Sequence, residues 1–147
     1  MPEMKTLHAI ATALLVSGLV SPARPQPRNV DFGPETLGLI NSHRASRGLP
    51  PLASRAALMA LARQHNQYQA ARGAIGHDGY ARRLAQAKAA GFSGICVENV
   101  GYDYRNAEQL FSGWRRSARH NRNLLRPDLR YAGVSVVGAY ATFFACR

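Results

Sequence analysis

The order of its segments constrains the fold of this chain most, because helical patterns come first and the clearest strand patterns come last. Residues 131–137 and 140–146 are rich in β-branched and aromatic side chains, and the short connection around Gly138 predicts a tight turn between two strands. Residues 95–102 have the same strand character. Helices followed by strands predict an α+β fold in which helices pack on a small antiparallel sheet.

Capping residues and glycines predict the helices. Pro34 suits the first turn of a helix, and Ser54 and Asn106 favour N-cap positions. Gln109 follows Asn106 at the spacing of a capping box, and Gly73 is a natural C-terminal stop. The predicted helices cover residues 34–47, 54–72, 80–90 and 107–125.

The N-terminus has the pattern of an export signal. Lys5 precedes an apolar run over residues 7–20, and Ser21 and Ala23 suit a cleavage site. The run is shorter than the roughly 20 residues that a membrane span needs, and an uncleaved N-terminal anchor is the alternative. We therefore expect the mature chain, without a transmembrane span, in the periplasm or outside the cell. The predicted organisation is a signal peptide over residues 1–23, an irregular leader over 24–35 and one domain over 36–147.

Both cysteines, Cys96 and Cys146, lie in the part that we expect to be exported. In an oxidising compartment two thiols of one small domain usually pair, so we predict a disulfide between them. Neither cysteine belongs to a Cys-x-x-Cys or Cys-x-x-His motif, which disfavours a zinc site built on cysteines.

The formal net charge of +11 favours an acidic partner. Export argues against nucleic acid, so anionic lipids or cell-envelope polymers are the expected partners. Arginines make up 17 of the 19 basic residues, which indicates that compositional bias contributes to this charge. One group of arginines could bind phosphate groups, or it could simply form a solvated helix face. This group comprises Arg115, Arg116, Arg119, Arg122, Arg126 and Arg130.

Three polar residues of the second half are candidates for a functional site: His77, Glu98 and His120. Two imidazoles and a carboxylate can bind a metal ion or carry out acid–base chemistry. They can equally form a satisfied hydrogen-bond network that only holds the fold together, because buried polar groups must be paired. Their spacing does not decide between these alternatives.

Several motifs occur in an order that resembles the bacterial branch of the CAP family, whose unit is the SCP domain. The similarity covers roughly residues 36–146, nearly the whole mature chain. The motifs are NSHRASRGLPPL at 41–52, GHD at 76–78, EN at 98–99, WRRSARH at 114–120, NLLRPD at 123–128 and YAGV at 131–134.

The resemblance implies an α-β-α sandwich with a cleft lined by two histidines and two acids. His77, Glu98 and His120 match three of these positions, and Ser117 stands where animal members have the second acid. Ser117 and His120 are three residues apart on a predicted helix and would share a face. No oxyanion donor is identifiable, so this pair alone does not predict a serine hydrolase.

The resemblance favours a monomeric binding or interaction module whose ligand is a lipid, an anionic envelope component or a protein. Such a module requires no cofactor. Some family members bind a divalent metal through the two histidines, and Zn²⁺ suits the imidazoles of His77 and His120. The alternative is a metal-assisted hydrolase in which His77, Glu98 and His120 hold and activate water. Whether the chain is an enzyme stays open at this point.

Overall fold

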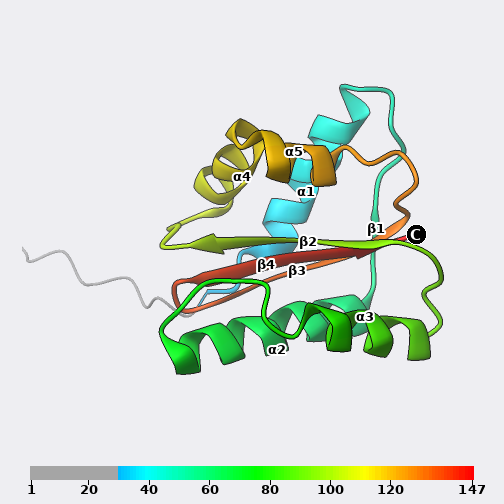
Figure 1. The fold of residues 1–147 in the computed structure, drawn as a ribbon. Coiled ribbons are helices and arrows are strands. Elements are labelled where there is room, and N and C mark those ends of the chain that lie inside the picture. The colour runs from blue at the N-terminus through cyan, green and yellow to red at the C-terminus, as the bar shows by residue number, and fades with distance from the viewer. Residues whose placement is uncertain (1–29) are drawn as a thin grey trace, which may run out of the picture.

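A four-stranded sheet lies between two layers of helices in the computed structural model, which describes residues 30–147 (Figure 1). In chain order the elements are α1 (Gly33–Ala45), β1 (Ala53–Ser54), α2 (Ala56–Arg72), α3 (Tyr80–Ala89), β2 (Cys96–Tyr102), α4 (Ala107–Arg116), α5 (Ala118–Leu124), β3 (Tyr131–Val137) and β4 (Tyr140–Cys146). Helices α1, α4 and α5 cover one face of the sheet, and α2 and α3 cover the other. The predicted α+β class and α-β-α sandwich are confirmed.

The strand order is β1-β3-β4-β2, and both pairings of β4 are antiparallel as predicted. Strand β1 was not predicted, and it runs parallel to β3, so the sheet is mixed rather than purely antiparallel. Ser54 lies in β1 and does not cap α2, whose N-cap is Arg55. Backbone bonds from Ala53 N to Arg130 O and from Arg55 N to Ala132 O hold this segment extended, which overrides the local capping preference.

The helix predicted over residues 107–125 is interrupted. Ser117 has extended backbone angles (φ −84°, ψ 116°), ends α4 and caps α5. Its Oγ accepts a bond from His120 N, with the two atoms 3.5 Å apart. The expectation that Ser117 and His120 share one face of a continuous helix is therefore wrong, because the serine side chain turns to the helix end that it caps.

The N-terminal boundary also differs from the expected one. The predicted signal peptide, residues 1–23, lies outside the described residues. Helix α1 begins at Gly33, one residue before the predicted helix start at Pro34, and so includes the last residues assigned to the leader. Asp31 contacts β3, since its carboxylate accepts bonds from Val136 N and from the Ser135 hydroxyl, both 2.8 Å away. The folded domain thus begins before residue 36.

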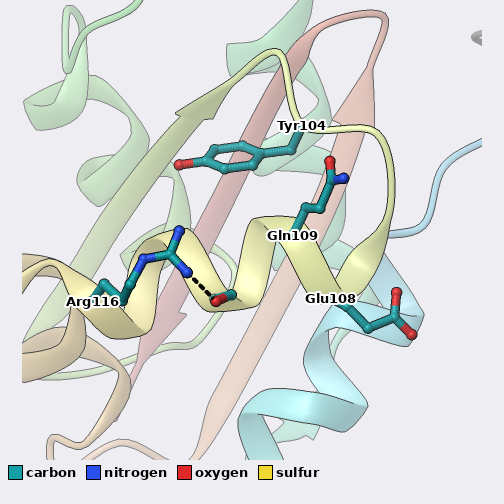
Figure 2. Close-up of a pocket in the computed structure, with 5 residues that line it drawn as sticks. Tyr104, Glu108, Gln109 and Arg116 are labelled. Atoms are coloured by element: carbon teal, nitrogen blue, oxygen red, sulfur yellow. Dashed lines mark hydrogen bonds between the residues drawn. The ribbon is translucent and has the colours of Figure 1, made fainter.

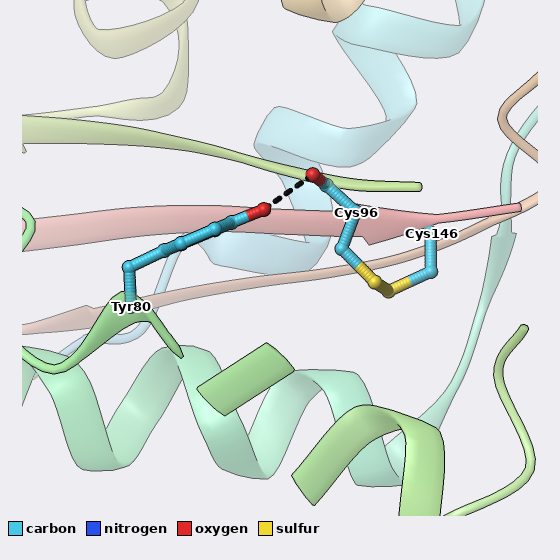
Figure 3. Close-up of a disulfide and its surroundings, with 3 residues drawn as sticks. All are labelled: Tyr80, Cys96 and Cys146. Carbon is cyan, nitrogen blue, oxygen red and sulfur yellow. Dashed lines mark hydrogen bonds between the residues drawn. A yellow bond between two sulfur atoms is a disulfide. The ribbon is translucent and has the colours of Figure 1, made fainter. Parts of the chain in front are cut away.

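The predicted disulfide between Cys96 and Cys146 is present and joins the ends of β2 and β4 (Figure 3). Both cysteines are buried, and together with Phe144 they pack against Leu58 and Leu61 of α2. A cross-link over 50 residues stabilises the fold by about 3–4 kcal/mol in the chain-entropy model.

Strand β2 lies at the edge of the sheet, and side chains from three helices cover that edge. Alternate carbonyl groups of an edge strand point outward and would otherwise be open to another strand. The capping bonds run from the Tyr80 hydroxyl to Cys96 O (2.5 Å), from Asn123 Nδ2 to Glu98 O (3.3 Å) and from Trp114 Nε1 to Val100 O (3.0 Å). Figure 3 shows the first of them. The edge that carries Glu98 is therefore tied to both helical layers.

Candidate functional site

The site is centred on Glu98 of β2, whose side chain is only 1% exposed. Arg83 of α3 reaches it with two hydrogen bonds, from Nε to Oε2 (2.6 Å) and from Nη2 to Oε1 (2.8 Å). Such a forked guanidinium–carboxylate pair is a strong charge-assisted arrangement. The attraction between the two charged groups offsets the free-energy cost of removing both of them from water. Loss of either partner would leave the other charge buried without compensation.

His77 lies on the other side of the same carboxylate, with its Nδ1 atom 2.8 Å from Glu98 Oε1. An ionised carboxylate only accepts hydrogen bonds, so Nδ1 carries the proton. In the neutral imidazole, Nε2 then keeps its lone pair, and the side chain is 49% exposed. Asp78 does not orient His77; it lies 3.9 Å from the Arg72 guanidinium at the surface.

Two buried side chains of α2 hold the loop that carries His77. Gly76 N donates to Gln69 Oε1 (3.0 Å), and Gly76 O lies 2.7 Å from Nε2 of His65. A carbonyl only accepts, so Nε2 of His65 carries the proton and its Nδ1 is the bare nitrogen. That Nδ1 has no hydrogen-bond partner among residues 30–147. Burial lowers the pKa of His65, although the charge of Glu98 opposes this shift.

His120 approaches the same edge of the sheet from the opposite helical layer. Its backbone carbonyl accepts a bond from Asn99 Nδ2 (3.1 Å), which ties α5 to β2. Burial lowers the pKa of the His120 imidazole, and the charges of His77 and Arg119 lower it further. The lowered pKa favours a neutral His120 imidazole.

A buried arginine fixes the helix that carries His120. Arg44 of α1 donates from Nη1 to Leu124 O (2.8 Å) and to Arg126 O (2.9 Å), at the C-terminal end of α5. Its Nε also donates to Pro50 O (2.9 Å). A cation that bonds the last carbonyl groups of a helix stabilises that end. Helix α5 is thus held at both ends, by Ser117 and by Arg44.

Of the four predicted cleft residues, His77 and Glu98 are in direct contact. His120 is linked to the same strand through its backbone carbonyl, which Asn99 bonds, and Ser117 caps α5. Among the described residues, no group of three or more His, Cys, Asp or Glu side chains is arranged to hold a metal ion. Both oxygens of Glu98 already accept hydrogen bonds, one of them from His77.

The main residue that sequence reasoning missed is Arg83. It is buried although it lies beside Arg82, which is exposed. Its spacing from Tyr80 and Ala87 is helical, which places it on the inward face of α3. That spacing is the one local signal of its role. His65 of α2 is buried as well.

The break at Ser117 also divides the group of arginines predicted as one face. On α4, Arg115 lies over the Phe111 ring and Arg116 bonds to the Ser112 hydroxyl. On α5, Arg119 and Arg122 are exposed, three residues apart, and have no ion-pair partner in the described part of the chain. Beyond the helix, Arg126 pairs with Asp128 (3.0 Å).

Comparison with known proteins identifies relatives of this fold. The profile of the "Cysteine-rich secretory protein family" matches residues 37–147. An extracellular protein containing an SCP domain from Bacillus anthracis has a similar structure, with a TM-score of 0.74 and 25% identity over 79% of this chain and 40% of that chain. A cysteine-rich secretory protein from Staphylococcus aureus gives a TM-score of 0.67 and 22% identity over 85% of this chain and 40% of that chain.

An outer surface protein from Borrelia burgdorferi shares the fold as well, with a TM-score of 0.66 and 14% identity over 78% of this chain and 90% of that chain. The present chain thus spans well under half the length of the first two relatives. Among curated proteins, none matches it. Within residues 30–147, no helix is both long enough and apolar enough to cross a membrane.

Proposed function

The chain belongs to the cysteine-rich secretory protein family, and we propose that it is an exported binding module rather than a hydrolase. One observation carries this proposal: Arg83 and His77 occupy both oxygens of Glu98, which is the one acid among the four cleft residues. A general base must reach the proton that it abstracts, and this carboxylate is buried with both oxygens already hydrogen-bonded to protein groups. The buried disulfide and the extracellular or outer-surface relatives support export.

We further propose that the partner is an anionic surface of the cell envelope, such as a membrane that contains acidic lipids. The chain has a net charge of +11, and Arg119 and Arg122 are exposed on α5 beside the His120 site. Arginine presents a planar set of donors that matches phosphate groups. Such attraction is long-ranged but screened by salt, with a Debye length of about 8 Å at physiological ionic strength.

Vesicle co-sedimentation tests this partner. The double variant R119Q/R122Q is compared with R63Q/R82Q, which removes the same charge from exposed arginines of α2 and α3. We expect the wild-type domain to bind vesicles with 30% anionic lipid at low salt, and R119Q/R122Q to bind at least about fivefold more weakly than R63Q/R82Q. An equal loss of vesicle affinity in the two double variants would refute a specific role of α5. Binding that does not change with lipid charge or salt concentration would refute it as well.

We also propose that His77 and His120 bind a divalent metal weakly. Burial lowers the pKa of His120, and Glu98 behind His77 supplies the carboxylate that commonly orients a metal-bound histidine. When bound, Zn²⁺ would act as a Lewis acid that polarises an oxygen of a ligand. Two protein nitrogens leave the remaining positions to water or ligand, so we expect weaker affinity than at a complete structural site.

Calorimetric zinc titration tests this expectation. Wild-type protein should bind about one equivalent of Zn²⁺, and H77A and H120A should each weaken binding at least about tenfold, whereas H43A should not. Unchanged affinity in both site variants would refute the metal proposal. Hydrolysis of a peptide, ester or peptidoglycan fragment that depends on zinc, His77 and His120 would overturn the binding-module proposal in favour of the hydrolase.

A further inference from the structure

A second candidate site lies away from the Glu98 cleft, on the outer surface of α4. A cavity of about 470 Å³ opens between the loop that follows β2 and this helix. Figure 2 shows the Tyr104 ring on one side of the cavity and Gln109 directed toward it from the helix. The lining residues are Tyr104, Glu108, Gln109, Ser112 and Arg116.

The aromatic side of this cavity is held in place by two glycines. A Cβ atom at Gly113 would collide with the Tyr104 hydroxyl, and one at Gly101 would lie only 3.2 Å from the Tyr104 ring, so the tyrosine packs close to the backbone at both positions. Tyr104 is therefore supported from behind by β2 and α4, and its ring packs on the hydrophobic core. An aromatic group that is fixed before a ligand arrives loses little conformational entropy on binding.

On the polar side of the cavity, several hydrogen-bond donors have no partner among residues 30–147. Gln109 Oε1 accepts from Arg105 N (3.1 Å), which leaves the Gln109 amide NH₂ free to donate. The Ser112 hydroxyl oxygen accepts from Arg116, so its proton is available, and Arg116 keeps further N–H groups. No acid within the described residues forms an ion pair with Arg116.

We propose that this cavity binds a sugar that carries a carboxylate. Arg116 would hold the carboxylate, which is the group that a guanidinium fork recognises best. The donors of Gln109 and Ser112 would take the neighbouring oxygens, and Glu108 at the rim would accept from hydroxyl groups. The apolar face of a sugar ring matches the exposed side of Tyr104, since binding sites combine an aromatic contact with a few placed polar groups.

This inference goes beyond the proposed function, because it concerns a small ligand and residues outside the histidine cleft and α5. Attraction to an anionic surface would weaken steeply with salt and would not distinguish Arg116 from a neighbouring arginine. Binding inside the cavity would depend on Arg116 more than on a neighbouring arginine. Arg115 provides the control, since it carries the same charge on the same helix and lies over Phe111 instead of lining the cavity.

NMR titration of the full domain with glucuronate tests the proposal, with glucose, acetate and inorganic phosphate as comparison ligands. We expect saturable shifts at Tyr104, Gln109 and Ser112, with glucuronate binding at least about tenfold more tightly than glucose or acetate. R116Q should weaken glucuronate binding at least about tenfold and R115Q less than about twofold. The amide spectrum of each free variant confirms that it is folded, and Y104L should also lose affinity.

Three results would overturn the proposal. The first is the absence of saturable shifts with glucuronate, and the second is an equal loss of affinity in R115Q and R116Q. The third is inorganic phosphate binding as tightly as glucuronate, which would identify an anion site without a sugar contact. None of these results depends on vesicle binding or on zinc, so they separate this inference from the proposed function.

Discussion

The face of the sheet that carries α1, α4 and α5 (the apolar face) holds the larger apolar cluster, whereas the face that carries α2 and α3 (the polar face) combines a smaller apolar cluster with most of the buried polar groups. Alternation along the strands produces this difference. In β4, Phe143 belongs to the apolar core under α4, and its neighbour Thr142 points to α2, where its hydroxyl donates to Asn66 Oδ1 (2.6 Å). The same backbone thus supports two kinds of interior.

The polar face connects the sheet to the functional loop. Asn66 of α2 donates to Ser135 O (2.7 Å), and Gln69, one turn further along, holds Gly76 beside His77. Hydrogen-bonded interior groups fix one geometry because each unmade bond is costly. The comparison indicates that the apolar face supplies most of the stability, while the polar face determines where His77 and Glu98 lie.

The largest expected effects compare one substitution on each face. On the apolar face, Phe143→Ala removes a fully buried ring that lies against Trp114. We expect a loss of about 3–5 kcal/mol in the free energy of unfolding, measured by chemical denaturation. Below the unfolding transition the imidazole NMR signals of His77 should not move. A clear change in those signals would show that the two faces are not independent.

On the polar face, Arg83→Met leaves the Glu98 carboxylate buried without its cation. We expect a similar loss of about 3–5 kcal/mol, because breaking a buried pair exposes the full cost of the remaining charge. Here the His77 signals should move as well. Arg82→Met is the matched control and should cost less than about 0.5 kcal/mol, since Arg82 is exposed. Equal effects at residues 82 and 83 would contradict the buried pair.

A smaller effect is expected in the pH dependence of stability. Burial lowers the pKa of His65 in the folded chain, so the unfolded chain takes up a proton more readily below the usual imidazole pKa of about 6.5. Stability should therefore be fully present above that pH and decline as the pH falls, by at most about 1.4 kcal/mol per pH unit for this group. His65→Gln should flatten the slope between neutral and mildly acidic pH. An unchanged slope would show that His65 does not contribute to it.

The parts of the molecule that depend on neighbouring residues in the chain could be predicted from the sequence. Gly73 ends α2 with a left-handed backbone angle (φ 62°), and Asn106 caps α4 through Gln109 N (2.9 Å). The strands of the C-terminal hairpin and the pairing of the two cysteines were also predicted. The residue pattern of a strand and the oxidation of two thiols depend little on the rest of the chain. The resemblance to the family assigned the histidines and Glu98 to one region.

The parts that depend on distant contacts could not be predicted. The break at Ser117 interrupts a segment whose helical pattern continues on both sides, and packing of α5 on β2 through Asn99 and Asn123 accompanies it. Ser54 has the side chain of a cap, but pairing with β3 decides its conformation. In the sequence, Arg83 resembles a solvent-exposed arginine. Its burial is explained only by the fold, which places Glu98 of β2 opposite it. In each case a tertiary partner determined the outcome.

The central claim is that Glu98 is fully engaged and holds His77 as the Nδ1–H tautomer, with Nε2 directed away from the carboxylate. Long-range ¹H–¹⁵N NMR of the histidine rings measures this tautomer directly, at a pH well above the usual imidazole pKa of about 6.5. The structure predicts that His77 is protonated on Nδ1 in the wild-type protein and that Glu98→Gln reduces this preference, since a neutral amide is a weaker acceptor. A wild-type His77 protonated on Nε2 would contradict the account.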